Sequence, residues 1–162
     1  MKLRAIDFDS LTRGFQPYID GYLKIEAEKK SLIESIQPQK KEIESIIISS
    51  SSGLMVDEIT QKRNVERFRV LQEELMKKDQ EFKTILKEMK DDLNTSVYDE
   101  LSQIITDWAK ENSIDIVTGK MEVVYCNDEC DVTNDIIEIL KTKGLYKEEK
   151  KEEKKEEYSL KG

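Results

Sequence analysis

The sequence predicts a mostly helical α+β protein, in which a long antiparallel coiled-coil hairpin is joined to a small β body. Two observations carry this prediction. Apolar residues recur every three or four positions over two long stretches, before and after a Ser-Gly break at 49–53, as they do in paired helices. Short β-branched runs lie near both ends of the chain, at 2–8 and 114–125. The strands of the body therefore come from both ends of the chain.

The composition favours long helices whose outer faces are solvated. Of the 162 residues, 38% are charged and only two are proline, which leaves few helix breakers. The net charge is −8, and the segment 147–162 contains as many Lys as Glu, so the excess acid lies in residues 1–146. This acidity argues against a nucleic-acid partner and against docking on anionic membrane surfaces.

The first element is a strand over residues 2–8, with Ile6 and Phe8 on the same face. Asp9 or Ser10 is then expected to cap a short helical turn. Charged residues follow Met1 directly, without the apolar segment of an export signal. No stretch approaches the roughly 18 apolar residues that a membrane span requires. We therefore expect a cytoplasmic protein with no membrane association.

The first arm is predicted to begin near Pro17 and to reach residue 48. Pro38 should bend it, because proline lacks a backbone donor. The alternative, a plain amphipathic helix on a globular core, stays open. The heptad stripe consists of Phe15, Tyr18, Tyr22, Ile25, Leu32, Ile36, Ile43 and Ile46, interrupted by Lys29 and Gln39.

A polar turn at about 48–56 is predicted to form the tip of the hairpin. Asp57 can cap the second arm, which should run to about Asn112. The tip carries more apolar residues than closing the hairpin requires, and exposed apolar clusters tend to bind other molecules. The expected client or partner contacts at the tip are Ile46, Ile47, Ile48, Leu54, Met55 and Val56.

The second arm is longer than the first, about 84 Å against about 46 Å at the helical rise. Its end must therefore pack against the body. This reasoning predicts that Val97, Leu101, Ile104, Ile105 and Trp108 lie in the core of the body. The predicted arm spans residues 10–96, and the body combines 1–9 with 97–141.

The C-terminal part of the body is predicted to be a β-hairpin followed by a helix. Ile114–Val117 and Met121–Tyr125 would pair around Gly119, which can adopt φ > 0. Thr133 is the expected N-cap of the helix. So small a sheet does not stand alone in water, which predicts that several subunits pool their strands. The expected oligomerisation residues are Ile6, Phe8, Ile114, Ile116, Val123, Tyr125, Ile136 and Leu140.

Residues 142–162 are predicted to be a charged tail, disordered or forming a solvated helix, because the Glu/Lys repeat has no apolar face to bury.

No catalytic constellation emerges from the sequence, and we predict neither an enzyme nor a cofactor. The chain has no His, and its six glycines form no phosphate-binding loop. Cys126 and Cys130 could form half of a metal site or a redox pair. The favoured interpretation is two small residues at a strand end and a loop, because cytosolic thiols stay reduced.

The order of elements resembles the Skp/OmpH family of holdase chaperones, with the C-terminal module as the specific part. The resemblance covers nearly residues 1–141. It rests on Ile6-Asp7, Trp108–Asn112, Ile114–Val117, Val123–Tyr125, Asp131–Thr133, Ile136, Ile137 and Leu140.

The resemblance implies a homotrimer whose strands form a small barrel and whose helical arms surround unfolded client proteins without ATP. Secreted members of the family carry a signal peptide and basic arms, in contrast to this chain. That difference favours a cytoplasmic role, such as a phage-encoded homologue that assists virion assembly. The alternative is a coiled-coil structural or assembly component of a larger particle, such as a phage virion.

Overall fold

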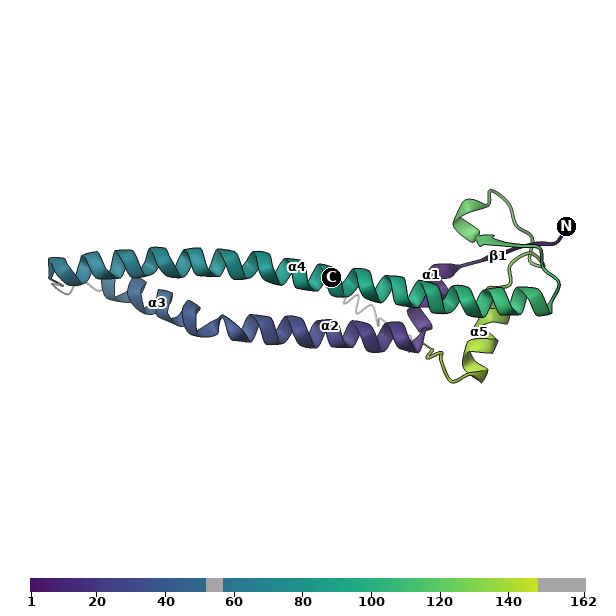
Figure 1. Ribbon diagram of the computed structural model, residues 1–162, viewed down its shortest axis with the longest axis horizontal. Coiled ribbons are helices and arrows are strands. Elements are labelled where there is room, and N and C mark those ends of the chain that lie inside the picture. Colours follow the sequence, from purple (N-terminus) through teal and green to yellow (C-terminus); the bar gives the residue numbers. More distant parts are fainter. Residues whose placement is uncertain (52–56, 149–162) are drawn as a thin grey trace, which may run out of the picture. The chain divides into compact units, whose positions relative to one another are not determined.

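The computed structural model describes residues 1–51 and 57–148, and it is mostly helical, with one small sheet (Figure 1). The described chain divides into two compact units. The body unit comprises residues 1–19 and 97–148, and the arm unit comprises residues 20–51 and 57–96. The elements are β1 (Leu3–Ile6), α1 (Phe8–Gly14), α2 (Gln16–Ser35), α3 (Gln37–Ser51), α4 (Glu58–Glu111), β2 (Ile116–Gly119), the one-turn 3-10 helix η1 (Lys120–Glu122) and α5 (Thr133–Thr142).

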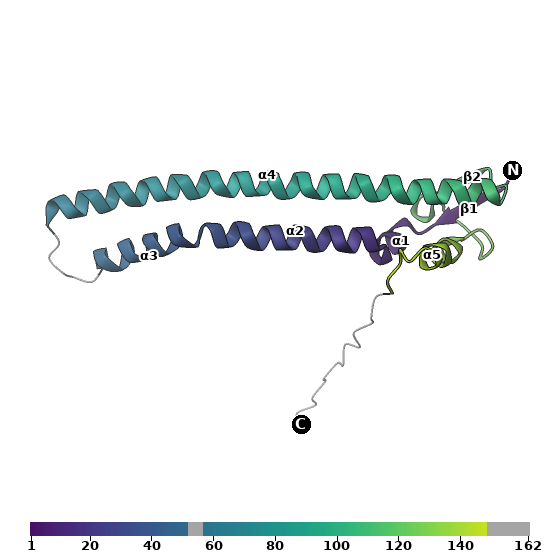
Figure 2. The same ribbon diagram turned by 60° about the horizontal axis from the view of Figure 1, so that its bottom comes forward.

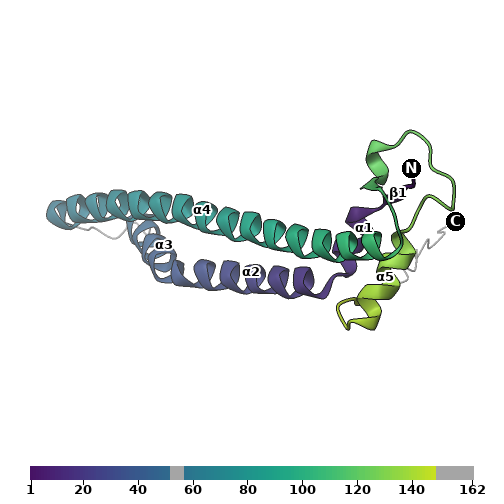
Figure 3. The same cartoon turned by 45° about the vertical axis from the view of Figure 1, so that its right-hand side comes forward.

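The arm unit is the predicted helical hairpin. Helices α2 and α3 lie alongside α4 in all three ribbon views (Figures 1, 2 and 3). Near the tip, the Arg67 guanidinium donates to both carboxylate oxygens of Glu42, at 2.6 and 2.8 Å. At the other end, Gly21 lies so close to Leu93 that an added Cβ would be 2.2 Å from Leu93 Cδ1. These contacts fix an antiparallel pairing along the whole unit.

The interruption expected at Pro38 is present. Helix α2 ends at Ser35 and α3 begins at Gln37, and the Ile36 N–H bonds to the carbonyl of Ile33. Proline at position 38 has no N–H to offer to the carbonyl one helical turn earlier, so the regular helix cannot continue through this point.

The second arm begins as predicted. The Thr60 N–H donates to Asp57 Oδ1 at 2.9 Å, and α4 then continues for 54 residues to Glu111. At the end of α3, Ser49 and Ser50 hydroxyls donate to the carbonyl of Ile46. Leu54, Met55 and Val56 lie outside the described residues.

The sheet of the body is parallel, and the predicted β-hairpin is wrong. Strand β1 pairs with β2 so that Leu3 faces Ile116. Gly119 keeps a φ of −67°, and the chain then enters η1 instead of turning back. On the edge of β1 that faces away from β2, Ala5 exchanges backbone hydrogen bonds with Cys130 and Val132, at 2.8 and 3.0 Å. Strand β1 is thus bonded on both edges.

Two helix caps differ from the sequence predictions. Helix α1 is capped by Asp7, whose Oδ1 accepts from the Ser10 N–H at 3.0 Å, instead of by Asp9 or Ser10. Val132 occupies the N-cap of α5, and the Thr133 N–H donates to Asp131 Oδ1 at 3.1 Å. In both helices an aspartate accepts from an N–H group of the first turn that would otherwise lack a partner.

The core of the body collects apolar residues from α1, α4 and α5. The end of α4 contributes Val97, Leu101 and Ile105, as predicted, while Ile104 and Trp108 are only half-buried. The largest fully buried side chains of the body are Leu11, Phe15, Leu101, Ile136 and Leu140.

The chain remains packed beyond the predicted end of the body at residue 141. Gly144 has a φ of 70°, which glycine adopts easily, and it closes the end of α5. The Gln16 N–H then donates to the Leu145 carbonyl and the Lys147 N–H to the Gly14 carbonyl, both at 2.8 Å. The start of the segment expected to be a solvated tail is therefore part of the body.

Candidate functional site

The body unit exposes a group of large apolar side chains around the segment that follows β2. We call this group, formed by Ile116, Met121, Val124 and Tyr125, the loop cluster. Met121 is 94% exposed and Tyr125 is 81% exposed, far more than is usual for such residues in a folded domain. Figure 3 shows the chain leaving β2, looping outward and returning to α5. Exposed apolar side chains that gather in one patch are typical of interaction sites, which makes this group a candidate.

Polar contacts hold the base of this loop. The Lys120 ammonium donates to Asp131 Oδ2, and the Thr118 hydroxyl donates to Glu122 Oε2 at 3.0 Å. Asp131 also accepts from the hydroxyl of Thr133 at 2.6 Å. Hydrogen bonds from Lys120 and Thr133 lower the pKa of Asp131 to about 2, so this carboxylate stays ionised and keeps both partners at neutral pH.

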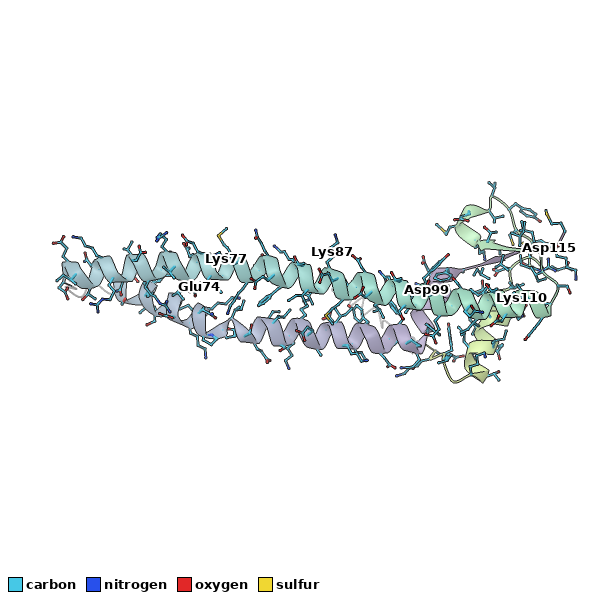
Figure 4. The ribbon with its side chains drawn as sticks, viewed as in Figure 1. Glu74, Lys77, Lys87, Asp99, Lys110 and Asp115 are labelled. Atoms are coloured by element: carbon cyan, nitrogen blue, oxygen red, sulfur yellow. The ribbon has the colours of Figure 1, made fainter. Side chains whose placement is uncertain are left out.

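A groove of about 670 Å³ lies beside the sheet. In it the rings of Phe8 and Tyr98 meet at a centroid distance of 5.3 Å and a tilt of 43°. Lys110 and Asp115, labelled in Figure 4, bring charge to the lining. Other lining residues are Ile6, Ser102, Ile105, Ala109, Ile114, Val117, Thr118 and Glu122.

The edge of β2 that faces away from β1 has no strand partner among residues 1–51 and 57–148. Unpaired backbone N–H and C=O groups on such an edge can add a strand from another chain. The groove lining includes Val117, Thr118 and Gly119 from this same strand. The free edge and the groove thus belong to one surface.

The residues predicted for oligomerisation divide into three groups. Ile6, Ile136 and Leu140 are buried in the core of the body unit, although Ile6 also reaches the groove lining. Phe8 and Ile114 line the groove, and Val123 is half-buried. Ile116 and Tyr125 are exposed. Their part in assembly stays a prediction.

Tyr98 and Val124 belong to this surface but were not predicted from the sequence. Tyr98 is 59% exposed and lies next to the buried Val97 in α4. Only the ring contact with Phe8, which is distant in the sequence, reveals it. Val124 sat within the run read as a strand, where alternation would have given it an ordinary solvent-facing position.

The arm unit has an apolar groove of about 410 Å³ between α3 and α4 near the tip. Ile46 and Ile47, two of the predicted contact residues, line it together with Val65 and Phe68. Ile48, the third described residue of that set, is 66% exposed. The polar lining residues are Ser50, Ser51 and Asn64. The structure therefore brings part of the predicted tip set to one apolar surface.

The outer faces of the arm are charged. Figure 4 shows side chains projecting along α4, with Glu74, Lys77 and Lys87 labelled. Arg69 pairs with Glu66 and Glu73 at 2.7 and 2.8 Å, and its hydrogen bond lowers the pKa of Glu66. The apolar groove contrasts with these exposed charged pairs.

Within the described part of the chain, no group of three or more potential ligands is placed to hold a metal ion. Cys126 and Cys130 are both free thiols and both half-buried. None of the described helices combines the length and apolar character needed to cross a membrane.

Comparison with known protein families gives a match over most of the chain. The model of the OmpH family, described as outer membrane protein (OmpH-like), matches residues 2–140. This range includes β1, both arms, the loop cluster and nearly all of α5. No curated protein sequence matches the chain.

Proposed function

Because the chain belongs to the OmpH-like family, we propose that it is an ATP-independent holdase that binds non-native or assembling proteins between the helical arms of a homotrimer. The family is known for chaperone function, and its members bind unfolded clients and form oligomers. They are chaperones and not enzymes.

One observation supports this proposal most directly: large apolar side chains remain exposed on both units of the chain. In the arm unit they border a groove whose surroundings are charged. Weak apolar contacts on a solvated helical arm suit a holdase, because an unfolded client offers many short apolar segments instead of one shape. Among the described residues, the exposed large apolar ones are Tyr22, Leu23, Ile33, Ile47, Ile48, Ile59, Val65, Met76 and Ile85 in the arm unit, and Met1, Tyr98, Ile116, Met121, Val124 and Tyr125 in the body unit.

Self-association through the body has its own support. The free edge of β2 can accept a strand, and Val123 already has extended backbone angles, φ −110° and ψ 124°. The segment that follows exposes Val124 and Tyr125 almost completely. Pairing this segment of one subunit with β2 of another would satisfy the edge and cover the loop cluster.

Suppression of aggregation tests the holdase. The full chain is mixed with a chemically denatured client that aggregates on dilution, and turbidity is followed at increasing chaperone concentration without nucleotide. We expect turbidity to fall with added chaperone and to reach its minimum at one trimer per client molecule. Unchanged turbidity, with no complex on size exclusion, contradicts the proposal.

Substitutions separate the two surfaces. Ile47→Ser with Val65→Ser should weaken suppression several-fold and leave the mass in solution unchanged. Val124→Glu with Tyr125→Glu should reduce the mass from trimer to monomer. Lys143→Glu, an exposed charge change outside both surfaces, is the matched control. A monomeric wild-type chain would contradict the trimer, whatever its chaperone activity.

The cytoplasmic location and a role in virion assembly stay predictions of the sequence. Co-purification from the native cell, followed by identification of the bound proteins, would test them together with the identity of the client.

A further inference from the structure

Two cysteines lie on one tight turn of the body unit, between the loop cluster and α5. The Cys130 N–H donates to the Asn127 carbonyl at 2.9 Å and to Asn127 Oδ1 at 3.0 Å. The Asp131 N–H reaches the same carbonyl at 3.4 Å. These bonds reverse the chain directly after Cys126, as in an Asx-stabilised turn, and so bring Cys126 back toward Cys130.

The turn also lets the two thiols influence each other. Hydrogen bonding with Cys130 is the largest cause that raises the pKa of Cys126 to about 11, and burial adds to the effect. Both side chains are half-buried, which leaves them accessible to small reagents. From the sequence alone, two small residues at a strand end and a loop were favoured over a redox pair, because four residues of spacing do not reveal the turn.

Cys130 is also fixed to the centre of the sheet. Its carbonyl accepts from the Ala5 N–H at 2.8 Å, and its Sγ lies 3.9 Å from the Leu3 carbonyl oxygen. Cys126, in contrast, directly follows Tyr125 of the loop cluster and has no backbone bond to β1 in the described chain. A covalent link between the two sulfurs would therefore tie the outer loop to β1.

We propose that Cys126 and Cys130 form a dithiol site that a low-molecular-weight disulfide, such as oxidised glutathione, converts into an intrachain disulfide. The thiolate of one cysteine attacks the reagent, forming a mixed disulfide and releasing one reagent thiolate. The second cysteine loses its proton and attacks the protein-bound sulfur, releasing the other reagent thiolate. Two protein thiols are oxidised, and one reagent disulfide is reduced to two thiols.

Mass measurement on the full chain tests the site. After equilibration with oxidised and reduced glutathione, acid quenching should reveal a species lighter by about 2 Da, as expected for the loss of two hydrogens. Proteolysis without reduction should place the bond within one peptide that contains both cysteines. A disulfide between two chains, or a mixed disulfide that persists in the wild type, overturns the proposal.

The single variants Cys126→Ser and Cys130→Ser are matched controls for each other. Each should accumulate the mixed disulfide and stop there, because no second thiol can resolve it. Circular dichroism before oxidation confirms that each variant is folded. If either variant fails to form the mixed disulfide while folded, its remaining thiol does not react with the reagent, and the proposal is overturned.

The contribution of the fold is measured by repeating the equilibration in denaturant. The ratio of disulfide to dithiol at fixed glutathione gives the effective concentration of the two thiols. We expect it to be at least about 10-fold higher in the folded chain, because the turn holds the sulfurs together before reaction. Equal ratios in the folded and denatured chains overturn the proposal. These readouts are chemical, so they do not depend on whether the protein acts as a holdase.

Discussion

The backbone N–H of Asp7 donates to the hydroxyl oxygen of Thr133 at 2.8 Å, although 126 residues separate them in the sequence. This bond joins the end of β1 to the first residue of α5, and Thr133 passes the interaction on to Asp131 through its own hydroxyl proton. Thr133 is only 8% exposed, so water does not replace these partners easily. Loss of this hydroxyl should therefore break the contacts with both Asp7 and Asp131.

Thr133→Val should destabilise the protein by about 1–3 kcal/mol, because the Asp7 N–H is left without its acceptor. Urea unfolding followed by circular dichroism measures the change. Thr133→Ser keeps the hydroxyl and is the matched control. If serine and valine cost the same, the hydrogen bond is not the cause and the prediction fails.

Acid should weaken the body through Asp131. Its pKa is about 2 in the folded chain, against an ordinary value of 3.8, so the folded state binds the proton less tightly than the unfolded state. The stabilisation is fully present above about pH 4 and disappears as the pH falls through about 2. Asp131→Asn should be less stable than the wild type at neutral pH.

Measurement of unfolding free energy between pH 2 and 6 tests this assignment. The difference between wild type and Asp131→Asn should shrink toward the acid end of that range. Asp128→Asn, an exposed residue on the same loop, is the control for the loss of one acidic charge. Parallel curves for wild type and Asp131→Asn would contradict the assignment.

Gly14→Ala should loosen the end of the described chain from the body. A Cβ at position 14 would be 2.2 Å from Cζ of Tyr146, so the ring has to move. We expect a loss of about 1–3 kcal/mol from this overpacking, larger than the usual helical gain of alanine over glycine. Thermal unfolding measures it.

A double-mutant cycle with Tyr146→Ala identifies the cause. Without the ring, Gly14→Ala should be neutral or stabilising, and the coupling between the two sites should be large. Additive effects would mean that the glycine is required for a reason other than the close approach of Tyr146.

Leu71→Ala should open the arm unit while the body stays folded. Among the buried apolar residues of the described chain, only Leu71 and Ile25 belong to this unit. Removing the leucine side chain from a thin interface should cost about 2–5 kcal/mol locally. Hydrogen exchange should show lost protection in α3 and the adjoining part of α4. Equal loss of protection in α5 would show that the two units unfold together.

The helical hairpin could be predicted from the sequence because its signals are local and repeated. The first-arm stripe that includes Ile25 and Ile43 follows helical periodicity, and Asp57 acts as a cap within one turn. Pro38 interrupts the helix because proline has no backbone N–H. Each of these features depends on residues at most a few positions apart.

The sheet could not be predicted in the same way. The β-branched run after Gly119 favours a strand, but the ion pair between Lys120 and Asp131 and the turn of η1 direct it outward. The true partner of β2 is β1, which lies at the other end of the chain. Thr133 likewise looked like a helix cap, whereas its hydroxyl is occupied by Asp7 and Asp131.

The candidate surfaces show the same contrast between local sequence signals and contacts of distant residues. Ile46 and Ile47 were predicted as contact residues, and they do line the arm groove. Tyr98 could not be found, because its significance depends on contact with Phe8 across ninety positions of sequence. Pairwise contacts at such separation leave no pattern in a single sequence.

The pairing of β1 with β2 also determines when the body can fold during synthesis. Leu3 pairs with Ile116, so the first strand leaves the ribosome long before its partner strand has been made. The helices of the arm can form in the meantime, since their contacts are closer in sequence and helices nucleate locally. A chain whose synthesis stops before β2 contains the arm helices but cannot form the sheet of the body. The body can therefore form only after β2 has been made.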